Sequence, residues 1–245
     1  MRVAVALALV LAAIPSASFA EPGASPLQGT TIAVDPGHNG RNWAHPREIN
    51  RLVDAGTLRK ACDTTGTATA SGYAEPAFTF DVALRLRRIL KAKGATVVLT
   101  RTSNTGWGPC ITERAAIGNR AQADAAVSIH ADGGPPSGRG FHVIYPPSIR
   151  GLTDDIALPS RCLALAMRRS YGSGTGLPLA TYIGGAGLSV RSDLGGLNLS
   201  HVPKVFVETG NMRNRRDAAL LESPGFRERI ARALAAGLAR YIARC

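Results

Sequence analysis

Short apolar runs alternate with longer segments of helical periodicity along most of the chain. Apolar and β-branched residues predict buried strands at 31–35, 96–100, 125–129, 141–145 and 205–207. Apolar residues spaced by three and four predict helices at 77–93, 111–122, 162–171 and 226–243. Because apolar strands alternate with helices, we expect one α/β domain with a twisted, mostly parallel sheet of about six strands and helices on both faces.

Two segments interrupt this pattern. Residues 39–72 are polar and rich in Gly, Thr and Arg, and the only element expected there is a short helix around 48–60. A surface excursion of this length often borders a functional site. Residues 184–196 are rich in glycine and are expected to form a substrate-facing loop.

The N-terminal residues have the pattern of an export signal. Arg2 precedes an apolar run at 3–14, and Ser18-Phe19-Ala20 has the small-x-small form of a cleavage site. We therefore expect a signal peptide at 1–20, a flexible leader at 21–29 and a catalytic domain at 30–245. The apolar run is too short to span a bilayer comfortably, and no later run is long enough. The sequence thus predicts a secreted protein of the bacterial periplasm or cell wall, without a transmembrane segment after signal removal.

The net charge narrows the choice of partners. The chain has 29 Lys and Arg against 17 Asp and Glu, a formal charge of +12, which favours a polyanionic partner. The export signal and the small number of aromatic residues argue against nucleic acid and favour an anionic polymer of the cell envelope. Many arginines lie on predicted helices, however, where they also fit an ordinary solvated face.

Four cysteines in an exported chain predict one or two disulfides, with three possible complete pairings. Cys62 and Cys110 both lie in Gly/Thr-rich loops, which favours their pairing. There is no C-x-x-C spacing, so a cysteine zinc site is not expected.

Polar residues follow three of the predicted strands. In sheets of this class ligands bind beyond the carboxyl ends of the strands, where His38, His130 and Glu208 are placed. Two histidines and one carboxylate form an adequate zinc site with an open position for water, and Glu75, just ahead of the first long helix, is the candidate third ligand. Glu208 would remain free to transfer protons.

Each of these residues also has a structural interpretation. A single histidine at a strand end is more often structural. Glu75 could be a negative charge that interacts favourably with the dipole at the N-terminus of the helix. Glu208 could be a buried structural carboxylate. Their joint placement favours the metal site. We do not include three further histidines in the metal site because their positions are less suitable: His45, His142 and His201. Asp35 and Asp132 adjoin the proposed ligands and suit imidazole orientation or turn formation.

With these residues in view, the chain resembles the zinc-dependent N-acetylmuramoyl-L-alanine amidases, bacterial autolysins and cell-separation enzymes. The resemblance covers nearly all of the mature chain and rests on an ordered set of short motifs: Asp35-Pro36-Gly37-His38, Glu75, Val98 to Arg101, Arg114 to Asn119, Ser128 to Ala131, and Pro203 through Glu208 and Gly210 to Asn214 and Asp217. It implies a six-stranded sheet, one zinc ion on His38, Glu75 and His130, and Glu208 as the catalytic carboxylate.

The implied substrate is peptidoglycan or a muramoyl peptide fragment, cleaved between the lactyl group of N-acetylmuramic acid and L-alanine. Arg191, in the glycine-rich loop, is expected to contact a substrate carboxylate or the oxyanion, and a monomer is expected. Two alternatives remain: a zinc carboxypeptidase or endopeptidase acting within the stem peptide, and a non-enzymatic wall-binding or activator protein. The chain departs from the family pattern at Asn39-Gly40, at Asp132 and after Gly210, but no proposed ligand is lost.

Overall fold

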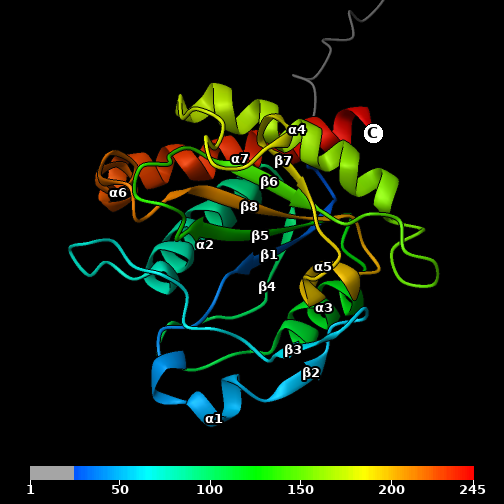
Figure 1. Ribbon diagram of the computed structural model, residues 1–245. Coiled ribbons are helices and arrows are strands. Elements are labelled where there is room, and N and C mark those ends of the chain that lie inside the picture. Colours follow the sequence, from blue (N-terminus) through cyan, green and yellow to red (C-terminus); the bar gives the residue numbers. More distant parts are fainter. Residues whose placement is uncertain (1–24) are drawn as a thin grey trace, which may run out of the picture.

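A six-stranded sheet forms the centre of the computed structural model, which describes residues 25–245 (Figure 1). Its strands are β1 (Thr31–Pro36), β4 (Thr96–Leu99), β5 (Ala125–Asp132), β6 (His142–Tyr145), β7 (Leu188–Val190) and β8 (Lys204–Asn211). They lie in the order β4-β1-β5-β8-β6-β7. The pairs of β4, β1, β5 and β8 are parallel, β6 is antiparallel to β8, and β7 is parallel to β6. The predicted α/β class with a mostly parallel sheet is confirmed.

Helices cover both faces of this sheet, as Figure 1 shows. Three long helices pack together on one face: α2 (Glu75–Ala92), α4 (Ala157–Thr175) and α7 (Pro224–Arg244). The other face carries α3 (Ile111–Arg120) and the short α5 (Gly195–Asn198), while α6 (Arg215–Glu222) precedes α7. Ile32 and Val127 belong to the large apolar core, whereas Ala33 and Ala126 belong to a second, small cluster. Because side chains alternate across a strand, large residues face the long helices and small ones face α3.

A buried polar network lies on the α3 side of the sheet. Asp35 accepts hydrogen bonds from Thr100 Oγ1 at 2.7 Å, Ser128 Oγ at 2.9 Å and Arg114 Nη1 at 2.9 Å, and Lys204 Nζ lies 3.3 Å away. Burial favours a higher pKa for Asp35, but the neighbouring Lys204 and Arg114 outweigh it and hold the pKa well below its usual range. The ionised carboxylate thus joins β1, β5, β8 and α3 behind the site described below.

The polar stretch after β1 contains the 3-10 helix η1 (Asn42–Ala44), helix α1 (Pro46–Ile49) and a hairpin of β2 (Leu52–Asp54) and β3 (Arg59–Ala61). The helix expected at 48–60 is therefore wrong beyond Ile49. The chain turns back at Gly56, whose φ of 87° is in the left-handed region, and Ala55 N bonds Leu58 O at 2.8 Å. A reversal at this point leaves no room for a continuous helix.

Two disulfides connect distant parts of the fold. Cys62 pairs with Cys110, the pairing favoured from the sequence, and links the end of the β2–β3 hairpin to the N-cap of α3. Cys162 pairs with Cys245 and links α4 to the end of α7. Both bonds therefore tie a segment near the molecular surface to a packed helix.

Other differences from the sequence expectations are local. Leu27, expected in a flexible leader, is fully buried in the main core, while the signal peptide at 1–20 lies outside the described residues. The glycine-rich segment expected to be a loop contains β7 and part of α5. Helix α6 was not expected, although Asn214 caps it by accepting hydrogen bonds from Arg216 N and Asp217 N. Within residues 25–245, no helix combines the length and apolarity needed to cross a membrane.

Candidate active site

A cavity of about 340 Å³ is lined by all five candidate site residues: His38, Glu75, His130, Arg191 and Glu208. His38 follows β1, Glu75 begins α2, His130 lies on β5 and Glu208 lies on β8. His130 and Glu208 are register partners on neighbouring parallel strands, which brings the two side chains to the same edge of the sheet. The structure therefore brings together the residues that the sequence placed at strand ends.

His38, Glu75 and His130 form a compact group of nitrogen and oxygen ligands. His38 Nε2 lies 3.3 Å from Glu75 Oε2, and His130 Nδ1 lies 3.0 Å from Glu75 Oε1. One ligand atom from each residue lies within 4.8 Å of the others, and no other such group of three is found in the described part of the chain. Two imidazoles and one carboxylate with these separations are a suitable set for zinc.

The backbone after β1 is adapted to this close approach. A Cβ atom added at Gly37 would lie 2.3 Å from His130 Cε1, so no larger residue fits without moving that imidazole. His38 itself has a φ of 58°, a left-handed conformation that is uncommon outside glycine. On its other side, His130 stacks on Phe206, with ring centroids 5.0 Å apart and an interplanar angle of 7°. Both imidazoles are thus fixed by backbone or ring packing.

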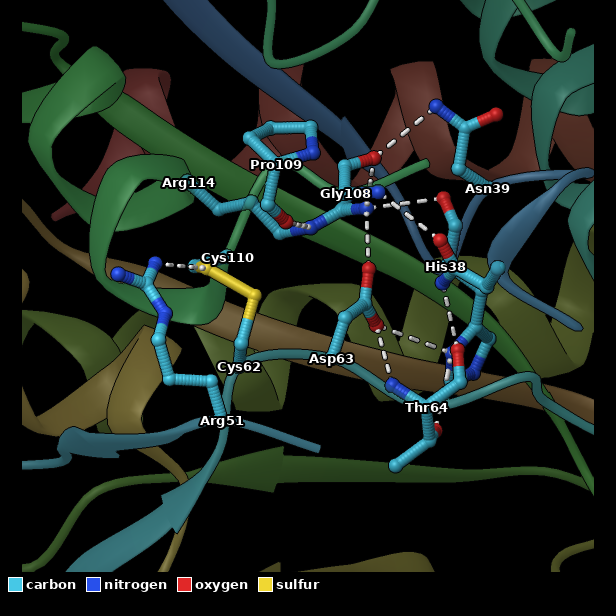
Figure 2. Close-up of a disulfide and its surroundings, with 11 residues drawn as sticks. His38, Asn39, Arg51, Cys62, Asp63, Thr64, Gly108, Pro109, Cys110 and Arg114 are labelled. Carbon is cyan, nitrogen blue, oxygen red and sulfur yellow. Dashed lines mark hydrogen bonds and ion pairs between the residues drawn. A yellow bond between two sulfur atoms is a disulfide. The ribbon is translucent and has the colours of Figure 1, made fainter. Parts of the chain in front are cut away.

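Asp63 and Thr64 hold the outer nitrogen of His38 (Figure 2). His38 Nδ1 lies 3.0 Å from the Thr64 carbonyl oxygen and 3.4 Å from Asp63 Oδ1. Arg114 Nη2 donates to Asp63 Oδ2 at 3.0 Å and to the His38 carbonyl oxygen at 2.8 Å. Because a carbonyl oxygen only accepts, Nδ1 carries a hydrogen, and Nε2 is the nitrogen that faces Glu75.

The sequence interpretation missed these positioning residues. Asp35 was considered for imidazole orientation, but it belongs to the ion-pair network behind the site, and Asp63 contacts His38 instead. Asp63 lies in the aperiodic polar stretch, where no pattern indicates which side chains turn inward. Its position next to Cys62, in a predicted disulfide, was the one available signal.

Charge is unevenly distributed among the ionisable groups of the cavity. Burial lowers the pKa of His38, but the Glu75 and Asp63 carboxylates outweigh this effect and raise it to about 10. Burial favours a raised pKa for Glu75, but the His38 and His130 imidazoles outweigh it and hold the pKa well below its usual range. Glu75 is consequently an ionised carboxylate that favours a positive charge between the two imidazoles.

The pKa of Glu208 is shifted in the opposite direction to that of Glu75. Burial, together with the carboxylates of Glu75 and Asp132, raises the pKa of Glu208 well above its ordinary value. Its Oε2 atom is buried and has no hydrogen-bond partner. Two nearby carboxyl groups with pKa values pushed apart can divide their tasks, one as a ligand and one as a proton carrier.

The remaining candidates lie at the edge of the cavity or outside it. Arg191 donates from Nε and Nη2 to Asp193, at 2.8 and 2.6 Å, and remains partly exposed. His45 pairs with Glu48, His142 is buried on β6, and His201 is exposed. In the described chain, none of these three histidines belongs to the ligand group, in agreement with their exclusion from the sequence pattern.

Comparisons with known proteins point to one family. The family described as N-acetylmuramoyl-L-alanine amidase matches residues 32–240. An N-acetylmuramoyl-L-alanine amidase of Mycobacterium tuberculosis is 45% identical over 236 residues, covering 96% of this chain and 95% of the relative. The crystal structure of an N-acetylmuramyl-L-alanine amidase from Mycobacterium smegmatis is similar, with a TM-score of 0.83 and 44% identity over 89% of this chain and 99% of that one. A Mycobacterium abscessus amidase gives a TM-score of 0.82 and 44% identity over 87% and 99%.

Proposed function

Because the chain belongs to the N-acetylmuramoyl-L-alanine amidase family, we propose that it is a peptidoglycan hydrolase cleaving the amide between the lactyl group of N-acetylmuramic acid and L-alanine. One observation of the structure supports this most directly. A single cavity holds the His-Glu-His group, in which Glu75 is ionised, beside the Glu208 carboxyl group, whose pKa is raised. This combination suits hydrolysis of an unactivated amide, which needs both electrophilic activation and proton transfer.

We propose that His38, Glu75 and His130 hold one zinc ion. The donor set fits this ion, since two imidazoles and an ionised carboxylate converge in the wall of the cavity. When bound, zinc would polarise the substrate carbonyl and acidify a water molecule. Asp63 and Thr64 hold Nδ1 of His38, so that Nε2 faces the ligand group.

Glu208 is the proposed proton carrier. Its unpartnered Oε2 accepts a proton from the attacking water and then gives it to the amide nitrogen, so that L-alanine leaves as a neutral amine. Arg191, at the edge of the same cavity, is the proposed contact for a substrate carboxylate. The proposed setting is the bacterial cell wall or periplasm, with peptidoglycan or its muramoyl peptide fragments as the partner and a monomeric protein as the active form.

The test is mass spectrometry of the products formed from a muramoyl peptide by the zinc-loaded protein. We expect free stem peptide beginning at L-alanine. The Glu208→Gln variant should retain zinc and lose roughly 10²- to 10⁴-fold in kcat, the usual contribution of a general acid–base group. Glu113→Gln is the matched control, since Glu113 is exposed and pairs only with Arg120 on the surface.

Each other outcome selects an alternative. Cleavage inside the stem peptide would assign the protein to the zinc peptidases. Binding of peptidoglycan without cleavage of either fragment or polymer, by protein with a full complement of zinc, would instead favour a wall-binding or activator protein.

A further inference from the structure

We propose that a second cleft, next to the catalytic cavity, binds the glycan strand on which the scissile muramoyl group is carried. This proposal rests on the proposed amidase function and extends it to the polymer. The cleft measures about 730 Å³, against about 340 Å³ for the catalytic cavity, and both are in the range of ligand-binding sites. Thr65, Gly66 and Thr67 line both spaces, so the two adjoin the same segment of the chain.

The chemistry of the cleft suits a neutral, hydroxyl-rich polymer. Its lining includes Asn39, Thr65, Thr67 and Thr69 together with backbone groups, and the one ionisable lining residue is Arg213. Sugar hydroxyl groups can exchange hydrogen bonds with such side chains without leaving a charge unpaired. Stem peptides carry carboxylates, and the basic residues Lys60 and Arg191 that would attract them border the other cavities instead.

A solvent-exposed indole marks one wall of this cleft. Trp43 lies in η1 and is 69% exposed, although tryptophan is on average a highly buried residue. The Arg41 guanidinium lies 5.9 Å from its ring centroid. The second tryptophan of the chain, Trp107, is also exposed and lies on a neighbouring segment, since Arg41 N bonds Gly106 O at 2.9 Å.

An exposed indole face is suited to the apolar C–H face of a sugar ring. Aromatic side chains combine a large apolar surface with little conformational freedom, and an aromatic contact contributes modestly beyond the area that it buries. Trp43 lines the cleft that adjoins the catalytic cavity at the shared 65–67 segment. The occupant is therefore the chain of sugars that extends from the muramoyl group being cleaved.

The test compares Trp43→Ala with the unchanged protein on two ligands. Binding of a neutral N-acetylglucosamine oligomer, which has the sugar backbone of the glycan without lactyl carboxylates, is measured by calorimetry in a Glu208→Ala background. The kcat/KM is measured on a short muramoyl dipeptide with Glu208 intact. We expect glycan binding to weaken roughly 2- to 10-fold, as for loss of one aromatic contact, with kcat/KM on the dipeptide unchanged. Leu158→Ala is the control, because Leu158 is an apolar side chain 74% exposed on α4.

Three results would overturn the proposal: unchanged glycan binding, an equal loss in the Leu158→Ala control, or weaker binding of free stem peptide in place of glycan. Failure of the proposed amidase function is distinguishable from these results. It would appear as no cleavage of the dipeptide by the unchanged protein, whereas the binding measurement needs no turnover.

Discussion

At the scale of single residues, the candidate site depends on groups that never reach the substrate. Asp63 contacts His38 on one side and Arg114 on the other. The side chains of Asp63 and Arg114 are almost fully buried. Imidazole ligands commonly donate their second N–H to such a partner, which fixes the tautomer and raises the basicity of the ligand nitrogen. Asp63 therefore positions His38 without binding metal itself.

We predict that Asp63→Asn lowers the zinc affinity roughly 10- to 100-fold, the usual cost of removing such a partner. Competition with a chelating dye measures this affinity, and the thermal midpoint of the metal-free protein reports stability separately. Asp155→Asn, a change at an exposed carboxylate, is the matched control. A lower thermal midpoint with unchanged zinc affinity would show that Asp63 serves only the fold.

At the scale of elements, the Cys62–Cys110 disulfide fixes the segment that carries Asp63 and Thr64. It joins the end of the β2–β3 hairpin to the start of α3, the helix that supplies Arg114 (Figure 2). The hairpin is a separate two-stranded sheet, and isolated hairpins are marginally stable. The disulfide thus connects the marginally stable hairpin to the helix whose Arg114 holds Asp63 and the His38 carbonyl group.

This position predicts different effects for the two disulfides. Replacing both cysteines of either pair by serine should lower stability, with about 4 kcal/mol expected for loops of this length in the chain-entropy model. Only the Cys62→Ser/Cys110→Ser variant should also weaken zinc binding, because Cys62 adjoins Asp63, whereas Cys162 and Cys245 join α4 to α7 and line a cavity without any of the proposed ligands. Denaturant unfolding and zinc titration of both variants measure the two effects. Equal zinc affinity in both would contradict this assignment.

The elements also show what could be predicted from the sequence. Buried strands and long amphipathic helices produce strong periodic patterns, so five of the six strands of the sheet and the residues at the strand ends were predictable, whereas the short β7 was not. The β2–β3 hairpin was not, because its three-residue strands are too short and too exposed to show alternation. Asp63 escaped prediction for the same reason, since its role depends on a turn that only the folded chain defines.

At the scale of the whole molecule, some of the surface arginines take part in ion pairs between and within helices. Glu228 on α7 pairs with Arg85 and Arg88 of α2 and with Arg232 on its own helix. These arginines belong to ion pairs on the helical surface, as the interpretation of a solvated face predicts. The glycan contacts proposed above depend on neutral side chains and an indole, so they are independent of most of this charge.

The strand order has a further consequence, for the time at which the protein becomes active. Strand β8 is the last strand along the chain but lies in the middle of the sheet, between β5 and β6, and it carries Glu208 (Figure 1). A growing chain can already contain His38, Glu75 and His130 and still lack this strand, which pairs with both β5 and β6. We therefore expect a chain without β8 to be inert, because it lacks both the strand that joins β5 to β6 and the Glu208 carboxyl group.

A truncated chain ending at Pro203 should show this directly. We expect it to remain largely unfolded by circular dichroism and to bind zinc far more weakly than the complete protein, although all three ligand residues are present. A compact fragment with the zinc affinity of the complete protein would mean that the site forms before the last strand arrives.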